Sequence, residues 1–175
     1  MKTILISLIS EQTIPNILVT AYYKPHILWF ITTERSERGR RTECIENTLK
    51  LKGLLPSPVD IKKVIVDQDS LTDCINKIES LIEKIHGEVE FIVNITGGNK
   101  VMALAVYEIF REIGQTCLTD RQKVVIGYMP LGKNEFLQVF PRKKPLKIYE
   151  LKELLNLEEY LMSYGFIIQN KHWLQ

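Results

Sequence analysis

The sequence predicts an α/β fold of the Rossmann type, with a doubly wound, mostly parallel sheet of six strands and helices on both faces. Four apolar runs rich in β-forming residues are each followed by a segment with helical periodicity. This is the pattern of strand–helix units in a parallel sheet. Two further apolar runs, residues 124–129 and 135–140, are separated by only five residues, too few for a parallel crossover. We therefore expect the strand order 3-2-1-4-5-6, with the last strand antiparallel.

The first part of the chain predicts three strands and two helices. The expected strands are residues 3–9, 26–32 and 59–66, and the expected helices are residues 14–23 and 36–52. Pro15 is compatible with the first turn of the first helix, where a missing N–H group has no cost. Gly53 follows the second helix, and glycine is favoured just after a helix end.

The rest of the chain predicts three strands and three helices. A helix with a clear 3.6-residue period can be capped by Asp69 or Ser70. Its apolar residues are Leu71, Ile75, Ile78, Ile82 and Ile85. The remaining strands are expected at residues 90–95, 124–129 and 135–140, and the next helix at residues 101–113. Gly114 is expected to end that helix, and Gly165 to end a last helix over residues 151–161.

Composition indicates a soluble globular protein. Hydrophobic and charged contents of 45% and 25% are ordinary for such a protein. The net charge of +2 is too small for a nucleic-acid coat, so we expect no direct binding of nucleic-acid polymers. No apolar run approaches the roughly 20 residues of a membrane span, and the apolar N-terminus lacks a signal-peptide cleavage site. Cys44, Cys74 and Cys117 form no Cys-x-x-Cys pair, which indicates reduced thiols and a cytoplasmic location.

The chain is expected to divide near residue 145. Residues 1–145 form the Rossmann-like domain, and residues 146–175 form a linker and a C-terminal helix. The basic, proline-bounded segment 141–145 is interpreted as a solvated connector. Too few residues follow Gly165 for a second core. They are expected to be a docking tail or the start of a missing effector domain, so the chain is either a fragment or a small complete protein.

One segment predicts a binding site for a negatively charged group. The apolar run 91–93 leads into Asn-Ile-Thr-Gly-Gly-Asn-Lys at residues 94–100, and a helix is expected to follow. Glycines let the backbone approach a ligand closely, and the N–H groups and dipole of a helix start favour negative charge. Lys100 adds a full positive charge. The segment matches neither the Walker loop nor the dinucleotide fingerprint, and a simple tight turn remains the alternative.

Polar residues at neighbouring strand ends extend this predicted site. In the expected strand order, the loop after the first strand lies beside the glycine loop, where ligands bind in such sheets. That loop contains Ser10, Gln12 and Thr13, and Thr33 and Arg35 end the second strand at the same edge. Ser10 or Thr13 can instead cap the next helix, and the arginines near Arg35 can form a solvated helix face.

Other polar residues carry open alternatives. Asn99 is either a helix cap or a reader of adenine. Asp67 and Asp69 suit either acid–base chemistry or a turn with a helix cap. His26, His86 and His172 lie far apart without a second ligand at metal spacing, so we assign no metal and no cofactor.

Three segments together resemble the CRISPR-associated Rossmann-fold (CARF) domain, in the branch fused to nuclease or other effector domains. They are Ser-Glu-Gln-Thr-Ile-Pro-Asn at 10–16, Asn-Ile-Thr-Gly-Gly-Asn-Lys at 94–100 and Leu-Glu-Glu-Tyr-Leu-Met-Ser-Tyr-Gly at 157–165. The resemblance covers about residues 1–165. The chain departs from the usual glycine-loop pattern at Asn99, where the family has threonine.

The resemblance implies a homodimer that binds cyclic oligoadenylate, most often the tetra-adenylate, across its cleft. This ligand is the second messenger of type III CRISPR antiviral defence, and its binding switches on an effector. The implied ligand-binding residues are Ser10, Gln12, Thr13, Thr33, Arg35, Thr96, Gly97, Gly98, Asn99 and Lys100.

The sequence leaves three other functions as alternatives to the sensor. A stand-alone ring nuclease would cleave the messenger without a metal, using Ser10 and Lys100. An unrelated dinucleotide-binding enzyme lacks support, because no glycine-rich turn follows the first strand. A DNA-binding regulator would need a basic recognition helix, and none is visible.

Overall fold

The computed structural model describes residues 1–55, 60–116, 122–152 and 154–169. These residues form one seven-stranded sheet with the order β3-β2-β1-β4-β5-β6-β7. The strands are β1 (Lys2–Leu8), β2 (Ile27–Thr32), β3 (Asp60–Ile65), β4 (Val89–Asn94), β5 (Gln122–Tyr128), β6 (Glu135–Phe140) and β7 (Ile148–Glu150). The predicted strand start at Val59, the residues Cys117 and His172, and the end of the predicted tail, residues 170–175, lie outside the described residues.

The predicted strand order and directions are confirmed. The five strands in the order β3-β2-β1-β4-β5 pair in parallel, and β6 pairs with β5 in the antiparallel direction. The sheet has one strand more than expected, because β7 pairs antiparallel with β6. This strand has only three residues and follows a basic segment, so no alternating pattern marks it in the sequence.

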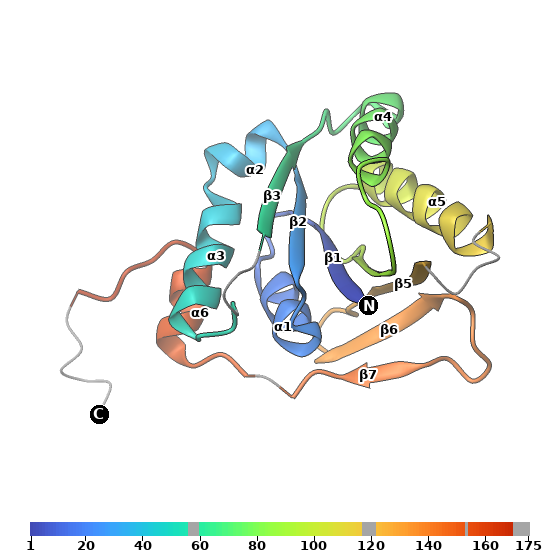
Figure 1. Ribbon diagram of the computed structural model, residues 1–175. Helices are drawn as coiled ribbons and strands as arrows, with labels where there is room; N and C mark the ends of the chain where they lie inside the picture. The colour runs from blue at the N-terminus through green and yellow to red at the C-terminus, as the bar shows by residue number, and fades with distance from the viewer. Residues whose placement is uncertain (56–59, 117–121, 153, 170–175) are drawn as a thin grey trace.

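Helices cover both faces of the sheet (Figure 1). The helices are α1 (Ile14–Tyr23), α2 (Glu34–Arg38), α3 (Arg41–Leu51), α4 (Leu71–Ile82), α5 (Lys100–Thr116) and α6 (Leu157–Ser163). Helices α4 and α5 lie on one face, and α1 and α3 lie on the other, with α6 against α3. No helix among the described residues is long and apolar enough to cross a bilayer.

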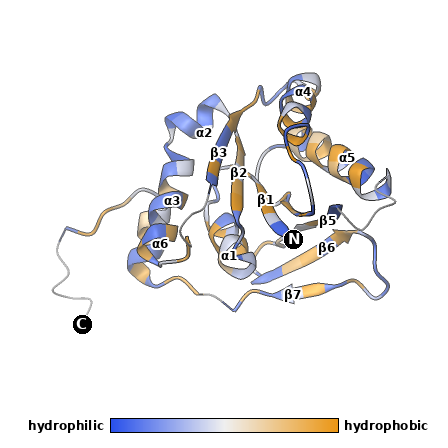
Figure 2. Cartoon of the chain, viewed as in Figure 1, coloured by the Kyte–Doolittle hydropathy of each residue, from blue (hydrophilic) through white to orange (hydrophobic). Residues whose placement is uncertain are grey.

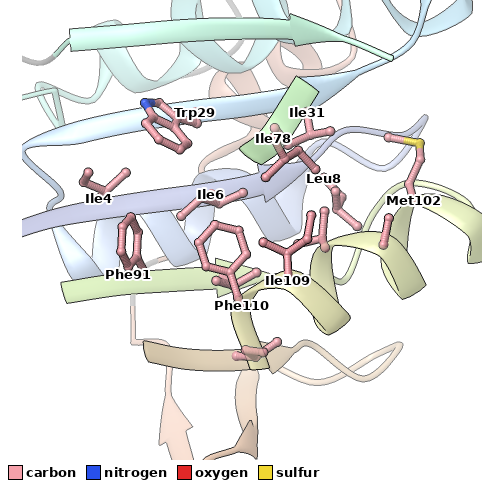
Figure 3. Close-up of a cluster of buried hydrophobic side chains, with 14 of the residues drawn as sticks. Ile4, Ile6, Leu8, Trp29, Ile31, Ile78, Phe91, Met102, Ile109 and Phe110 are labelled. Atoms are coloured by element: carbon pink, nitrogen blue, oxygen red, sulfur yellow. The ribbon is translucent and has the colours of Figure 1, made fainter. Parts of the chain in front are cut away.

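Each face of the sheet has its own hydrophobic core. Successive side chains of a strand point to opposite faces, so Ile4 and Ile6 of β1 pack towards α4 and α5, together with Trp29, Phe91 and Phe110 (Figure 3). The intervening side chains pack towards α1 and α3. Figure 2 shows the central strands as hydrophobic and α2 and α3 as largely hydrophilic. Burial on both faces explains why the first strands are continuous apolar runs.

The predicted helix 36–52 is wrong in one respect, because the chain forms two helices there. Helix α2 ends at Arg38, and α3 begins at Arg41 after Arg40 adopts a left-handed conformation with φ 54°. The Glu37 carboxylate accepts hydrogen bonds from the hydroxyl groups of Thr32, at 2.8 Å, and Thr42, at 2.9 Å. These bonds tie the end of β2 and both helices to one side chain, which stabilises the break.

The predicted helix end at Gly114 is also wrong. Helix α5 continues to Thr116. A Cβ atom at residue 114 would overlap the ring of Phe140 on β6. Glycine is therefore required here for close packing between helix and sheet, and not to end the helix.

The last helix begins later than predicted, at Leu157. The Asn156 side chain accepts a hydrogen bond from the Glu159 N–H group, and the Glu159 carboxylate accepts one from the Asn156 N–H group, which forms a capping box. Glu159 also pairs with Lys52 at the end of α3, at 2.8 Å, with both side chains about nine-tenths buried. Gly165, with φ 91°, follows the helix as predicted. The other elements agree in type with the prediction, and their ends differ by at most three residues.

Candidate functional site

The loops after β1 and β4 lie side by side, as predicted. Ser7 of β1 pairs with Asn94 of β4 in the parallel ladder, so both strands end at the same edge. A Cβ atom on Gly97 would overlap the carbonyl oxygen of Leu8 and would lie 3.3 Å from the hydroxyl oxygen of Ser10. The glycine loop is therefore packed directly on the end of β1, and only glycine fits at residue 97.

A small hollow of about 130 Å³ opens at this edge of the sheet. Five of the predicted site residues line it: Ser10, Thr33, Arg35, Gly98 and Asn99. The prediction missed its other residues, which are Ile9, Glu11, Ser36, Gln68 and Met102. Gln68 follows β3 at the same edge, so the strand order was the signal that could have identified it.

The backbone of the glycine loop presents a row of unoccupied hydrogen-bond donors. The N–H groups of residues 97–101 donate no hydrogen bond to another described residue, whereas the Met102 N–H group is capped by Asn99. Gly98 adopts φ 71°, a left-handed conformation that turns the chain into α5. Helix α5 has 17 residues, and its dipole adds partial positive charge at this end. These N–H groups form a suitable seat for an anion.

Lys100 is the first residue of α5 and is exposed. Its ammonium group forms no ion pair or hydrogen bond with another described residue. It therefore remains available to a ligand at the helix start.

Asn99 acts as the cap of α5. Its side-chain oxygen accepts a hydrogen bond from the Met102 N–H group at 2.9 Å, and its amide nitrogen donates to the carbonyl oxygen of Gln68 at 2.6 Å. The cap interpretation is thus confirmed, and the second bond joins the glycine loop to the loop after β3. Both polar ends of the Asn99 side chain are engaged within the protein.

Thr96 belongs to a buried hydrogen-bond network. The Asn94 side-chain oxygen accepts from the Thr96 N–H group at 3.1 Å and from the Thr96 hydroxyl at 2.5 Å. The amide nitrogen of Asn94 donates to the side-chain oxygen of Asn16 at 3.0 Å, and the Asn16 amide donates to Leu8 O at 3.4 Å. The Thr96 oxygen also accepts from the Met129 N–H group at 2.8 Å. This network holds the glycine loop between α1 and the end of β5.

The loop after β1 contains no side-chain cap for α1. Thr13 occupies the N-cap position, but its hydroxyl accepts no capping hydrogen bond and is fully buried without a partner among the described residues. The Ser10 hydroxyl accepts from the Gln12 N–H group at 3.3 Å, inside its own loop. The prediction that Ser10 or Thr13 caps α1 is therefore wrong. Ser10 is half-buried and Gln12 is exposed, so both can be reached from the edge of the sheet.

Arg35 lies between the small hollow and a larger one of about 440 Å³. The larger hollow is also lined by Arg38, Lys77, Asp67 and Asp69. Thr33 faces both hollows and caps α2, accepting from the Ser36 N–H group at 3.2 Å. The Arg35 side chain is exposed and forms no ion pair with a described residue. Arg40 and Arg41 instead pair with Glu43 and Glu11.

The aspartates after β3 form a turn. Asp67 accepts from the Asp69 N–H group at 3.0 Å, and Ser70, rather than Asp69, caps α4. Asp73 accepts from the Asp67 N–H group at 2.8 Å, and this bond, together with Lys77, lowers the pKa of the Asp73 carboxyl. A carboxylate with a lowered pKa is a poor general base at neutral pH. The turn interpretation of Asp67 and Asp69 is the one that the contacts support.

The described residues provide no other obvious reactive group at this edge. Burial raises the pKa of the Cys44 and Cys74 thiols, which disfavours the nucleophilic thiolate. The described residues contain no group of three side chains placed to hold a metal ion.

Comparison with known proteins places the chain in a family. The model of the Card1 CARF domain matches residues 4–160. A search of curated proteins by sequence finds no match.

Solved structures share the fold at low sequence identity. Can2 from Sulfobacillus thermosulfidooxidans, in complex with cyclic tetra-adenylate, is 20% identical over 96% of this chain, with a TM-score of 0.76. VC1899 from Vibrio cholerae is 14% identical over 93%, with a TM-score of 0.69. Csm6 from Enterococcus italicus, bound to cyclic hexa-2′-fluoro-hexa-dAMP, is 14% identical over 75%, with a TM-score of 0.55. This chain spans only 42%, 39% and 34% of the lengths of these proteins.

Proposed function

The chain belongs to the Card1 CARF domain family, and on this premise we propose that it is a sensor domain for cyclic oligoadenylate in type III CRISPR antiviral signalling. The observation that carries the proposal is the row of free N–H groups at residues 97–101, with Lys100 beside it. Two structures with the same fold contain cyclic adenylate ligands. Cyclic tetra-adenylate is the ligand that we propose for this chain.

The predicted site residues take two kinds of role in this proposal. Ser10, Arg35 and Lys100, with the N–H groups of Gly97 and Gly98, contact phosphate or ribose. Gln12 is exposed beside them and extends the same surface. The other predicted residues, Thr13, Thr33, Thr96 and Asn99, support the loops, because they are buried or engaged in hydrogen bonds within the protein. The positive charge at the proposed site then comes from a few side chains and not from the whole surface, which agrees with a net charge of only +2 for the chain.

The proposed sensor is a homodimer whose two-fold axis passes between the carboxyl edges of the two sheets. A cyclic tetranucleotide carries four phosphates, and one chain offers a single glycine loop. Two symmetric copies would present two such loops to a symmetric ring. We expect a dimer in sedimentation or light-scattering measurements at micromolar concentration. A protein that stays monomeric both with and without cyclic tetra-adenylate would exclude this arrangement.

Replacing Lys100 with alanine is expected to weaken the binding of cyclic tetra-adenylate without unfolding the domain. A charge-assisted hydrogen bond contributes roughly 1.5–3 kcal/mol, which corresponds to about 10- to 150-fold in affinity for one site. Calorimetric titration of both proteins measures this change. Lys84→Ala is the matched control, because Lys84 is also exposed and lies just after α4. Equal affinities of the wild type and Lys100→Ala would show that Lys100 is only a surface residue.

We further propose that the domain binds the messenger and cleaves it slowly or not at all. Ring opening requires a ribose 2′-hydroxyl in line with the adjacent phosphorus, and positioning alone accelerates such a step. General acid–base catalysis would add about 100- to 10,000-fold, but no histidine lines the two hollows, and Asp67 and Asp69 stabilise a turn. Ser10 and Lys100 remain the candidates that stabilise developing charge if the domain is a ring nuclease.

Incubation with cyclic tetra-adenylate in EDTA, followed by chromatography, distinguishes the sensor from the ring nuclease. We expect tight binding and no turnover over hours. Multiple turnovers within minutes, abolished by Ser10→Ala or Lys100→Ala, would instead establish a metal-independent ring nuclease.

A further inference from the structure

A second charged surface lies on β7 and on the segment that leads into it. Residues 142–152 contain five basic residues and one acidic residue. The net charge of these residues is therefore +4. Because the whole chain has a net charge of +2, the rest of the chain has a net charge of −2. The five are Arg142, Lys143, Lys144, Lys147 and Lys152. All five are exposed, and none forms an ion pair with another described residue.

Aromatic rings lie beside two of these cations, Lys147 and Lys152. A hollow of about 670 Å³ is lined by Tyr22 and Lys24 from the end of α1 and by Tyr149 and Lys152 from β7 and its flank. The rings of Tyr22 and Tyr149 are 5.9 Å apart, and the Lys147 ammonium lies 4.6 Å from the centre of the Tyr149 ring. Tyr22 is 43% exposed, so part of its side chain can be reached from solvent. Glu150 is the one acidic side chain that lines the hollow.

We refer to residues 142–152 together with Tyr22 and Lys24 as the basic–aromatic surface. It is separate from the anion seat, which is formed by the N–H groups of residues 97–101. Helix α1 has ten residues and begins after the Ser10–Thr13 loop at the anion seat. Tyr22 lies in its last turn, and Lys24 directly follows the helix. A helix of this length spans about 15 Å. Strand β7 is also the outermost strand of the sheet, four strands away from β1 (Figure 1).

We propose that the basic–aromatic surface binds single-stranded nucleic acid. Proteins that bind single strands without sequence preference combine cations, which contact phosphates, with aromatic side chains on which bases stack. Lysines without nearby rings would suit a solvated connector, as the sequence suggested for residues 141–145. Here Lys24 and Lys152 line a hollow with Tyr22 and Tyr149, whose rings meet edge to face, and Lys147 lies over the Tyr149 ring. The small net charge of the chain concealed this local concentration of charge.

Fluorescence anisotropy with labelled 20-nucleotide oligouridylate and oligothymidylate tests the proposal. We expect dissociation constants on the order of 1–100 μM at physiological salt, as for non-specific nucleic-acid binding. The double variant Lys144→Gln/Lys152→Gln should weaken binding and reduce the slope of log affinity against log salt by about 1.4, because each phosphate contact to a single strand contributes about 0.7. Tyr22→Ala should weaken binding by about 5- to 150-fold, the range for loss of one stacked base.

The double variant Lys50→Gln/Lys84→Gln is the matched control, because it removes the same charge from exposed lysines elsewhere. It should keep the wild-type salt slope. Several outcomes would overturn the proposal: no binding of either oligonucleotide, equal losses in the two double variants, or loss of binding in Lys100→Ala, which would locate the polymer at the anion seat. Binding to phosphatidylserine vesicles without binding to oligonucleotides would also overturn it and would indicate a membrane surface.

Discussion

The Gly97→Ala variant is expected to lose both stability and ligand affinity. The new Cβ atom would overlap the backbone carbonyl oxygen of Leu8, and a carbonyl in a β-strand cannot rotate away as a flexible side chain can. Overpacking in a close-packed region costs about 1–3 kcal/mol, sometimes more. The glycine loop must also shift away from β1, which displaces the N–H groups that form the anion seat. Because a displacement of about 1 Å at a site can cost about 100-fold, we expect at least that loss of affinity.

Urea denaturation and calorimetric titration with cyclic tetra-adenylate measure the two effects. Gly39→Ala is the control: residue 39 has φ −78°, and the nearest atom to its Cβ is in the flexible side chain of Arg41, at 3.3 Å. This control should have nearly wild-type affinity. A Gly97→Ala protein with wild-type stability and affinity would mean that the loop is not packed on β1 in solution.

Replacing Asn94 with leucine is expected to lower the free energy of unfolding by about 3–5 kcal/mol. Leucine has a similar size but provides no partner for the side-chain oxygen of Asn16 or for the N–H and hydroxyl groups of Thr96. Each buried group left without a hydrogen bond costs about 1–3 kcal/mol. Asn94 and Asn16 are fully buried, so water cannot replace the lost partner without a rearrangement.

Urea denaturation measures this effect, and Asn47→Leu provides the same substitution at an exposed residue of α3. That control should change the free energy of unfolding by less than about 0.5 kcal/mol. Asn94→Leu should also weaken ligand binding, because Thr96 positions the glycine loop. A loss of stability below about 1 kcal/mol, the contribution of one ordinary hydrogen bond, would contradict the importance of the network.

The sequence was sufficient to predict the order and directions of the first six strands of the sheet. Strand order follows from alternating strand and helix patterns because parallel crossovers place successive strands by a few strong rules. The two glycines followed by Asn99 and Lys100 identified a helix start with free N–H groups. This local signal does not depend on distant residues.

The wrong helix end at Gly114 has one physical cause, which is a partner far away in the sequence. Gly114 resembles a helix end until Phe140 is placed against it. The Thr96 hydroxyl likewise bonds with Asn94 and with the N–H group of Met129, a residue 33 positions later. The break before α3 depends instead on nearer residues, because the Glu37 carboxylate accepts a hydrogen bond from a threonine five positions away on each side. Periodicity and turn preferences describe only neighbours along the chain, so they cannot reveal such pairs.

The pair of Lys52 and Glu159 has a consequence for how the protein unfolds. The Lys52 ammonium donates to the Glu159 carboxylate at 2.8 Å and to the Leu154 carbonyl at 3.0 Å, away from most solvent. Removing the Lys52 ammonium would leave the Glu159 carboxylate largely buried without its ion-pair partner, which is strongly destabilising. Because this buried pair joins the end of α3 to α6, we expect the two helices to unfold together. The amide hydrogens of α6 should exchange with solvent mainly through the global opening of the domain, and not by fraying of a short terminal helix.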